Sequence, residues 1–548
     1  MHRACCLAFL ACTLPAQSLR EAIERFTADR DSLARAAAPA ARQRALLQEH
    51  QQSLAKVEFD QLDPGGRIDW LLLDNHLRAE SRELEHREQK LAEIAPLLPF
   101  AATIEALAAR ARRGGREDGK AAAETLVGIA AQAASARTEA AGKSLTPALA
   151  NRAAQRIEHL RGELRAWHKF HDGYAPLVSW WTREPMPKAD QALAEYAGFL
   201  RERFVGQSRP GLQVITGDPI GRQALLDDLA REWIPYTPEE LVTLAGHELA
   251  WCRTEMRRAA QELGCGDDVA KALELVKNRH VAPGDQPQLI TDLAEEAIVF
   301  LEERDLVTIP ALCKETWRVT MMSPQRQLVN PFFLGGEVIQ VSYPTDTMTH
   351  ADKLMSMRGN NRHFARATVH HELIPGHHLQ GFVAARERPY RRIFDTPFYG
   401  EGWALYWEML LWDLGFAKSP EDRLGMLFWR SHRCARIVFS LGFHLGTVTP
   451  QQAIDLLVEQ VGHERANAEA EVRRSFGGDY PPLYQAAYML GGLQLRALRQ
   501  ELAGMADKAF HDAVLRENSI PIELVRAALA GKPVAKDLRP TWRFAAAR

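Results

Sequence analysis

Apolar residues recur at helical spacing through most of the chain. From Leu19 to Phe26, from Leu33 to Val57 and from Ile68 to Leu98 they return every three or four positions, and charged residues occupy the opposite face. A strong helix start stands at Thr237, where the sequence Thr-Pro-Glu-Glu places a cap and a capping-box glutamate in register. The pattern predicts a mainly α-helical protein.

The helical pattern is interrupted at a few points. Pro and Gly residues from Asp60 to Gly66 predict a turn. Bulky and β-branched residues gather at Leu306 to Ile309 and at Trp317 to Met321, and the run from Val338 to Tyr343 follows two glycines and stops at Pro344. We therefore expect one small β element in this part of the chain.

Length and charge limit the classes of protein that the chain can form. A chain of 548 residues is longer than one hydrophobic core usually supports. We expect an N-terminal helical region, residues 18–230, and a second region, residues 231–548, that carries the chemistry described below. The net charge of −2 favours neither nucleic acid nor an anionic membrane as a general partner. After the first residues, no apolar run is long enough to span a membrane.

The first residues are typical of a targeting segment. Arg3 gives a positive start, an apolar stretch follows, and Met1 to Gln17 fits a short secretory signal peptide. Phe-Leu-Ala-Cys, ending at Cys12, also resembles a lipoprotein box in which that cysteine is lipidated. We expect an exported protein, either periplasmic, secreted or lipid-anchored. A cytoplasmic protein with an apolar start is the alternative.

One histidine-rich stretch carries the chemistry. Four histidines and one glutamate stand between His370 and His378, and two more carboxylates follow at Glu401 and Glu408. Neutral imidazole and carboxylate form the ligand set of catalytic zinc, which keeps one position open for water. A further carboxylate beside that water can act as general base.

The spacing of the histidines departs from the usual His-Glu-x-x-His motif. His377 comes six positions after His371, which is a rotation of about 600° on a regular helix. A local bulge at Ile374-Pro375-Gly376 could restore a shared face. The pairs His370/His377 and His371/His378 would align without any bulge, and spacing alone does not choose among them.

The two motifs together resemble a known family. His-Glu-x-x-Pro-Gly-His-His-x-Gln, followed by Glu-Gly-Trp-Ala-Leu-Tyr-x-Glu, resembles the domain of unknown function 885, which is placed among the glutamate-zincin metallopeptidases. This resemblance implies His371, His377 and Glu401 as ligands of one zinc ion and Glu372 as general base. It also implies helices that wall a deep channel, with an edge strand before the metal helix that pairs with a peptide substrate. An ordinary hairpin and a histidine-rich surface helix are the alternatives.

Other residues near these motifs are candidates for supporting roles. Glu408 is seven residues after Glu401, hence on nearly the same helix face, and is predicted to orient a ligand histidine. His444 and Arg474 are candidates for contacts with the site or the substrate.

A tyrosine is expected to assist the reaction. Tyr488 fits the spacing of the family's Tyr-x-x-Gly, and a phenol that faces the metal could donate to the oxyanion of a tetrahedral intermediate. We prefer it to Tyr480 and Tyr484; a buried structural tyrosine is the alternative.

The sequence as a whole predicts a zinc-dependent hydrolase, specifically a metallopeptidase that cleaves oligopeptides. Two other functions stay open. One is hydrolysis of a non-peptide amide or ester, and the other is a non-catalytic, metal-stapled protein that binds peptides.

Overall fold

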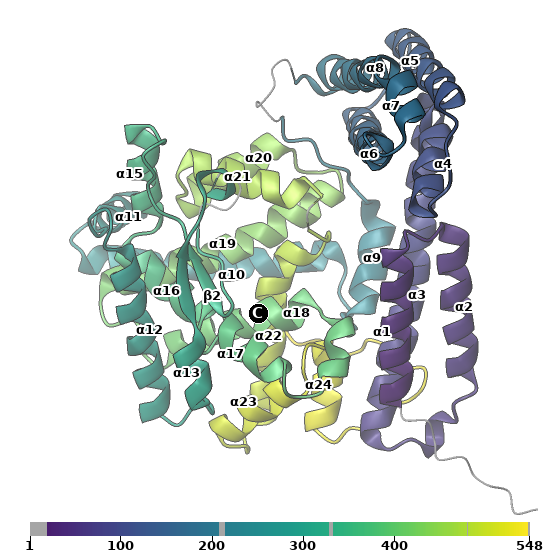
Figure 1. Ribbon diagram of the computed structural model, residues 1–548. Helices are drawn as coiled ribbons and strands as arrows, with labels where there is room; N and C mark the ends of the chain where they lie inside the picture. The colour runs from purple at the N-terminus through teal and green to yellow at the C-terminus, as the bar shows by residue number, and fades with distance from the viewer. Residues whose placement is uncertain (1–18, 208–213, 328–331, 479, 546–548) are drawn as a thin grey trace, which may run out of the picture. The chain divides into compact units, whose positions relative to one another are not determined.

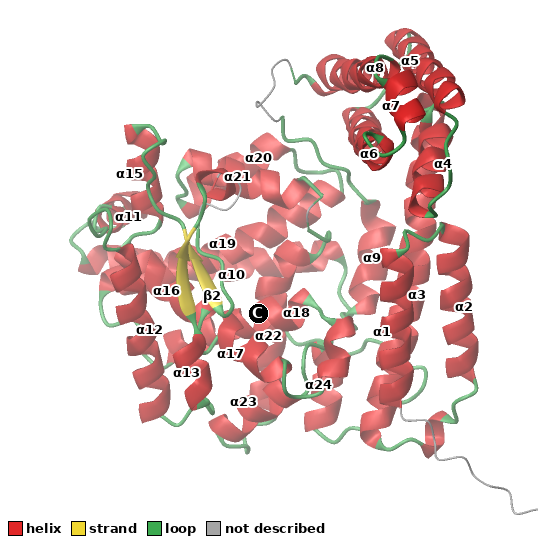
Figure 2. Ribbon diagram, viewed as in Figure 1, coloured by secondary structure: helices red, strands yellow, loops and turns green. Residues whose placement is uncertain are grey.

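The computed structural model describes residues 19–207, 214–327, 332–478 and 480–545, and helices dominate it (Figure 1, Figure 2). Helices contain 71 % of the residues and strands 2 %, so the predicted mainly α-helical fold is confirmed. The predicted targeting segment, with Cys12, lies outside the described residues. Within the described part no single helix is long and apolar enough to cross a membrane, although the bent pair 64–97 and 101–112 passes the same test of length and composition.

The chain forms two compact units. The first consists of the described residues of 1–82, 220–471 and 481–548, and the second of those of 83–219 and 472–480. Each unit is built from separate segments of the sequence. The helices 64–94 and 465–476 each have residues in both units. The expected division by role, at residue 230, stays a prediction.

The first unit contains the two strands and most of the helices. In chain order its helices are α1 (Leu19–Arg35), α2 (Ala40–Ala55), η1 (Phe59–Gln61), the start of α3 (Pro64–Ile94), α9 (Gly221–Arg231), α10 (Pro238–Glu262), α11 (Val269–Lys277), α12 (Gln286–Glu303), α13 (Ala311–Thr316), α14 (Pro324–Gln327), α15 (His350–Gly359), α16 (Arg362–Glu372), α17 (His377–Ala384), η4 (Pro389–Phe394), α18 (Pro397–Asp413), α19 (Pro420–His444), α20 (Pro450–Asp455), η5 (Leu456–Val461), the start of α21 (Arg465–Phe476), α22 (Tyr484–Glu501), α23 (Asp507–Arg516) and α24 (Ile522–Leu529).

The second unit is a helical bundle with its own core. It contains the end of α3, η2 (Ala95–Leu97), α4 (Ala101–Arg112), α5 (Gly119–Ala141), α6 (Pro147–His171), α7 (Pro176–Thr182), α8 (Pro185–Leu200), η3 (Arg201–Val205) and the end of α21. Side chains such as Ile104, Leu126, Ile157 and Leu193, one from each long helix of the bundle, meet in one apolar cluster. Alanines of α5 fill much of this cluster, and their small size lets the helices approach closely.

Helix starts follow the sequence where a cap is present. The predicted capping box at Thr237 is confirmed, and α10 begins one residue later. The prediction of one helix from Leu33 to Val57 is wrong, because α1 ends at Arg35 and a new helix, α2, begins at Ala40. Pro39 is the N-cap of α2. The predicted turn at 60–66 is only half right. The Asp63 carboxylate accepts a hydrogen bond from the Gly66 N–H at 2.6 Å, so the two glycines lie in the first turn of α3.

The β element is a parallel pair of strands. β1 (Arg318–Met321) pairs with β2 (Val338–Val341), with Arg318 opposite Val338, so the alternative of a hairpin is wrong. Leu306 to Ile309 forms no strand, and the N–H and hydroxyl of Thr308 donate to Asp512 instead. The apolar face of β2 is buried against α12 and α16, which fixes the strand beside the histidine-rich helix.

Helices α18 and α22 touch backbone to backbone. A Cβ atom on Gly402 would lie 2.6 Å from the Cα of Gly491, and one on Gly491 would lie 2.0 Å from the carbonyl oxygen of Phe398. Only glycine at both positions permits this approach. The contact holds Glu401 of α18 directly against the first turns of α22.

Candidate metal centre

The histidine-rich stretch is two helices joined by a tight turn. α16 ends at Glu372 and α17 begins at His377. The Gly376 N–H donates to the carbonyl of His370 at 3.0 Å. A Cβ atom on Gly376 would lie 1.8 Å from the carbonyl oxygen of His371, so no other residue fits there. The predicted rearrangement at 374–376 is thus a full break in the helix, and it brings the rings of His371 and His377 to 4.9 Å between centroids.

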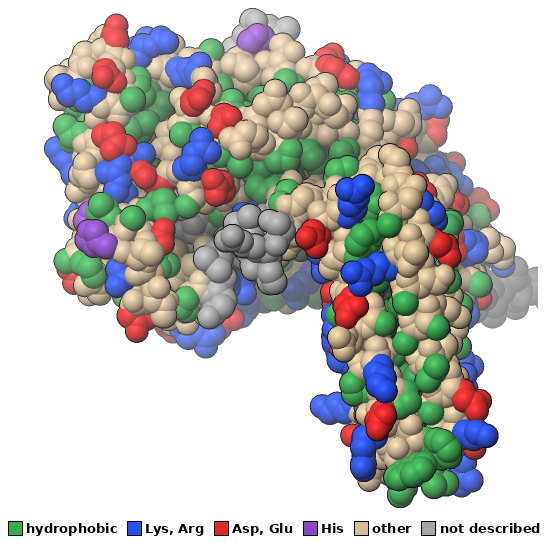
Figure 3. All heavy atoms as spheres, turned by 90° about the horizontal axis from the view of Figure 1, so that it is seen from above, with side chains coloured by type: hydrophobic (Ala, Val, Ile, Leu, Met, Phe, Trp, Pro, Cys, Tyr) green, Lys and Arg blue, Asp and Glu red, His purple; other side chains and the backbone are tan. Residues whose placement is uncertain are grey.

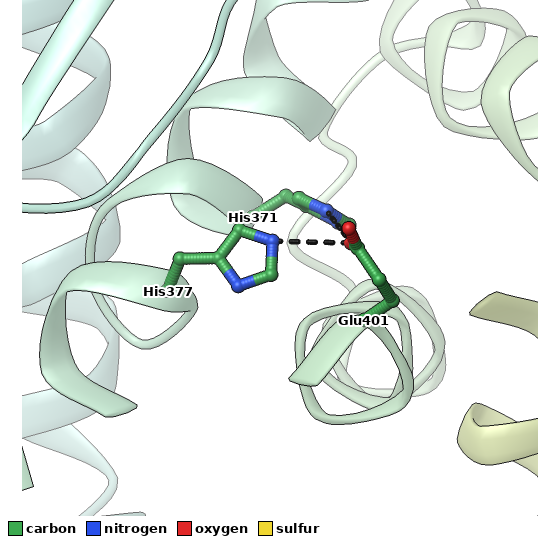
Figure 4. A group of neighbouring side chains, drawn as sticks. All are labelled: His371, His377 and Glu401. Carbon is green, nitrogen blue, oxygen red and sulfur yellow. Dashed lines mark hydrogen bonds and ion pairs between the residues drawn. The ribbon is translucent and has the colours of Figure 1, made fainter. Parts of the chain in front are cut away.

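The three predicted ligands meet at one point (Figure 4). One ligand atom from each of His371, His377 and Glu401 lies within 4.8 Å of the others. The Oε2 atom of Glu401 is 3.4 Å from His371 Nε2 and 3.1 Å from His377 Nε2. Around a tetrahedral zinc ion with bonds of about 2.0–2.1 Å, ligand atoms are about 3.4 Å apart. The two distances from Glu401 are close to this spacing, and the three residue types are those that bind zinc.

The site opens to solvent on one side. The side chains of His371 and Glu401 are 2 % and 10 % exposed, whereas that of His377 is 22 % exposed. Of the three side chains, that of His377 is the most accessible to solvent. The deep channel expected at this site stays a prediction.

The other two histidines of the stretch have different partners. The fully buried ring of His370 packs edge-on against Phe416, at 5.7 Å between centroids. His378 Nε2 lies 2.8 Å from the carbonyl oxygen of Cys313. The structure thus brings together His371 and His377, and neither of the pairs that would align on an unbroken helix.

A carboxylate orients the first ligand. His371 Nδ1 lies 2.7 Å from Glu408 Oε1, and the Arg433 guanidinium lies 3.6 Å from the same oxygen. Donation of the Nδ1 proton to Glu408 would leave Nε2, which faces Glu401, as the atom of His371 that can bind a metal. Glu408 is thus placed as its predicted role requires.

Burial and neighbouring charges give the ligands unusual pKa values. Burial lowers the pKa of His371, but hydrogen bonds to Glu401 and Glu408 outweigh this and raise it to about 9. Burial also lowers the pKa of His377, and the charge of Glu401 reverses the effect and raises it. Burial would raise the pKa of Glu401, but His377 and His371 hold it well below its usual range. The site thus attracts positive charge, which protons or a metal ion can supply.

Glu372 lies beside the ligands but is not one of the three that converge. Its carbonyl accepts a hydrogen bond from the Gly336 N–H at 3.3 Å, and a Cβ atom on Gly335 would lie 2.2 Å from Oε2. No other described residue forms a hydrogen bond with its half-buried carboxylate. Burial raises the pKa of this carboxyl above its ordinary value. A carboxylate in this state is a competent proton acceptor.

Two tyrosines of α22 contact the ligands. The Tyr484 hydroxyl donates to Oε1 of Glu401. The ring of Tyr488 is stacked on that of His371, at 6.0 Å and 14° between planes, and the guanidinium groups of Arg433 and Arg436 lie over it. The sequence preferred Tyr488 and missed the contact of Tyr484. The two residues are one helical turn apart, so they share a face and spacing does not separate them.

Two further candidates have other surroundings. His444 is buried in the last turn of α19, where it packs against Phe443 at 5.2 Å between ring centroids. Arg474 belongs to the second unit, and its guanidinium lies over the ring of Tyr480. One contact that the sequence did not suggest ties the site together: the indole N–H of Trp403 donates to the carbonyl of Pro375 at 2.8 Å. It links α18 to the turn between the two ligand histidines.

The start of α18 depends on a buried acid. Thr396 caps this helix, and its hydroxyl donates to Glu232 Oε2 at 2.8 Å. Burial raises the pKa of Glu232 from 4.5 to about 7. Because the folded state binds this proton more tightly than the unfolded state, the stability that the proton contributes is full below pH 4.5 and is lost as the pH rises through about 7.

We expect Glu232→Gln to remove part of the pH dependence of stability. Between pH 4.5 and 7.5 the wild type should lose roughly 3 kcal/mol through this group, since one pKa unit corresponds to about 1.4 kcal/mol. In the Glu232→Gln variant the free energy of unfolding should fall by roughly 3 kcal/mol less over the same pH range. Urea unfolding at a series of pH values measures this difference. Glu85→Gln, at an exposed glutamate of α3 that forms no ion pair with another described residue, is the control. If the free energy of unfolding falls equally with pH in the wild type and in Glu232→Gln, Glu232 has an ordinary pKa in the folded protein.

Comparisons with known proteins find solved structures of similar fold. No curated protein matches it significantly. A solved structure from Shewanella oneidensis, described as a "putative lipoprotein of unknown function", has a TM-score of 0.71 at 18 % identity and covers 94 % of this chain and 100 % of its own. Another with a similar description, from Colwellia psychrerythraea, has a TM-score of 0.57 at 15 % identity and covers 90 % of each chain. These likenesses concern the fold.

A family match covers most of the sequence. Residues 23–529 match the family described as bacterial protein of unknown function (DUF885). The matched range contains the three converging ligands, Glu372 and both tyrosines of α22. The chain therefore belongs to the DUF885 family.

Proposed function

We propose that this protein is a zinc-dependent hydrolase that cleaves peptide bonds. The observation that carries the proposal is the convergence of two imidazoles and a carboxylate, with Glu401 Oε2 at 3.4 Å and 3.1 Å from the two imidazole nitrogens and a further, half-buried carboxylate beside them. A purely structural zinc usually has four protein ligands, whereas three ligands leave a position for water. His371, His377 and Glu401 would hold the ion.

In this proposal, each residue of the site has a separate role in hydrolysis. A bound zinc ion would lower the pKa of a water molecule toward about 7 and polarise the scissile carbonyl. Glu372 accepts the proton of the attacking water and passes it to the leaving amine. Glu408 keeps His371 in the required tautomer. A tyrosine hydroxyl of α22 donates to the oxyanion, with Tyr488 as the predicted donor.

Purified protein should contain about one zinc ion per chain and cleave a broad peptide library. A chelator should remove both the metal and the cleavage, and zinc should restore both. Elemental analysis and mass spectrometry of the library measure these results. Zinc without any cleavage would support a structural metal, and cleavage that survives complete metal removal would refute the mechanism.

We further propose that the protein is exported and anchored through a lipid at Cys12. The lipoprotein box at residues 9–12 and the description of the two similar structures support this location. Mass spectrometry of protein from its native host should find a mature chain that begins between Cys12 and Leu19, with acyl chains if it begins at Cys12. An intact Met1 terminus in the cytosolic fraction would contradict export.

A further inference from the structure

The second unit carries a concentrated patch of exposed aromatic and apolar side chains. Phe170 lies in the last turn of α6, Tyr174 lies in the turn that follows, and Leu177, Trp180 and Trp181 lie on α7. The described part of the chain exposes 13 large apolar side chains. These five of the 13 lie within a stretch of twelve residues. Tyr174 is 80 %, Leu177 71 % and Trp180 62 % exposed. We call these five residues the aromatic patch.

The aromatic patch is held in place and is not a loose loop. Val178 and Thr182, on the opposite face of α7, are buried. A Cβ atom on Gly119 would lie 2.5 Å from the carbonyl oxygen of Leu177, so α7 is pressed against the start of α5. The Gly173 N–H donates to the Ser179 hydroxyl at 2.8 Å, which closes the turn before the helix. The fold therefore keeps these side chains in water at a fixed position, although burying them would be favourable.

The side chains of the patch have the character of a membrane interface. Tryptophan and tyrosine combine an apolar ring with a polar N–H or O–H, and they are enriched at the depth of lipid headgroups. The rings of Trp180 and Trp181 lie edge to face at 5.0 Å and present both indoles together. Figure 3 shows hydrophobic side chains gathered at one end of this unit.

The charges at the edge of the patch are mainly positive. Lys169 and Arg183 flank it and are exposed, and neither forms a hydrogen bond or ion pair with another described residue. Asp172 is the acid between them in sequence. Just before α5, next to the Gly119 that touches Leu177 and Trp181, the exposed Arg116 and Asp118 are opposite in charge, and Glu184 is 3.5 Å from Lys188, so these charges offset one another. Two free cations against one acid favour a surface of anionic headgroups.

We propose that the aromatic patch binds the interfacial layer of an anionic lipid bilayer. Trp180, Trp181 and Leu177 enter the boundary between headgroups and acyl chains, and Lys169 and Arg183 contact lipid phosphates. This binding needs neither the metal nor a lipidated cysteine. Binding through the patch would fix the orientation of the protein on the membrane surface. A lipid anchor alone would leave that orientation free.

Vesicle binding tests this proposal on the full chain carrying Cys12→Ala, so that no acyl group contributes. The protein should sediment with large vesicles of phosphatidylethanolamine and phosphatidylglycerol, and less with vesicles of phosphatidylcholine. Trp180→Ala/Trp181→Ala should reduce the partition coefficient about tenfold or more, because two large rings leave the interface. Lys169→Ala/Arg183→Ala should weaken binding to the anionic vesicles only, and most clearly at low salt.

A matched pair of substitutions separates the patch from general hydrophobicity. Leu177→Ala should lower vesicle binding, whereas Leu312→Ala, at an exposed leucine of the first unit, should leave it unchanged. Circular dichroism confirms that each variant is folded. The proposal is overturned if the wild type does not bind, or if the tryptophan variant binds equally well. It is also overturned if that substitution changes only the oligomeric state in light scattering, since the patch would then bind protein.

Discussion

Glu372→Gln is expected to reduce peptide cleavage by about 10²–10⁴-fold while the protein keeps its zinc. The amide has the size and shape of the carboxylate but cannot accept the proton of the attacking water. Glu372 is not among the converging ligand atoms, so metal content should remain near one ion per chain. Because its half-buried carboxylate has no hydrogen bond to another described residue, the substitution should also leave the fold intact. Turnover, zinc content and thermal unfolding are measured on the same preparation.

Two controls make the result specific. Glu372→Asp retains a carboxylate that is withdrawn by one methylene, and it should recover part of the lost rate. Glu239→Gln makes the same chemical change at an exposed position and should cleave like the wild type. Loss of zinc from Glu372→Gln would show that Glu372 is a ligand. Unchanged cleavage would remove it from the mechanism.

His377→Ala is expected to remove most of the bound zinc and, with it, all measurable cleavage. The substitution deletes one of three protein ligands, and even changes at groups that only orient ligands typically cost 10–100-fold in metal affinity. The His377 side chain is partly exposed at the start of α17, so its loss should scarcely lower stability. Zinc titration with a competing chelator measures the affinity directly.

The two neighbouring histidines supply matched controls for this experiment. His378→Ala breaks the contact with the Cys313 carbonyl, and His370→Ala leaves a cavity beside Phe416. Both variants should lose stability, and both should keep zinc when folded. Zinc retained in His377→Ala and lost in His378→Ala would mean that the site uses the pair His371/His378.

Local chemistry made much of the fold predictable from the sequence. The capping box at Thr237 starts a helix, because its two hydrogen bonds lie within four residues. Pro39 stands directly before α2, and the predicted helix from Leu33 to Val57 is wrong because it rests on apolar spacing and passes over this proline. The ligand residues could be proposed for the same reason, since motif and spacing restrict them to a few choices.

Contacts between distant residues could not be predicted in the same way. Nothing in the residues near β1 shows that its partner is parallel and follows some 20 positions later. The choice of His371 with His377 depends on how closely Gly376 approaches a carbonyl of the preceding turn. Tyr484 and Tyr488 share a helix face, and only the packing of α18 on α22 decides which hydroxyl contacts Glu401. Such choices arise in the packed protein and leave no local trace.

The glycine contact between α18 and α22 has a consequence for the order of events during synthesis. The ribosome releases the chain from its N-terminus, so His371, His377 and Glu401 emerge well before Gly491. Until α22 arrives, α18 lacks the helix on which its Gly402 packs, and Glu401 lacks the Tyr484 hydroxyl that donates to it. The metal site is therefore completed late. A chain that ends before α22 lacks both contacts, so the arrangement of Glu401 described here requires most of the sequence.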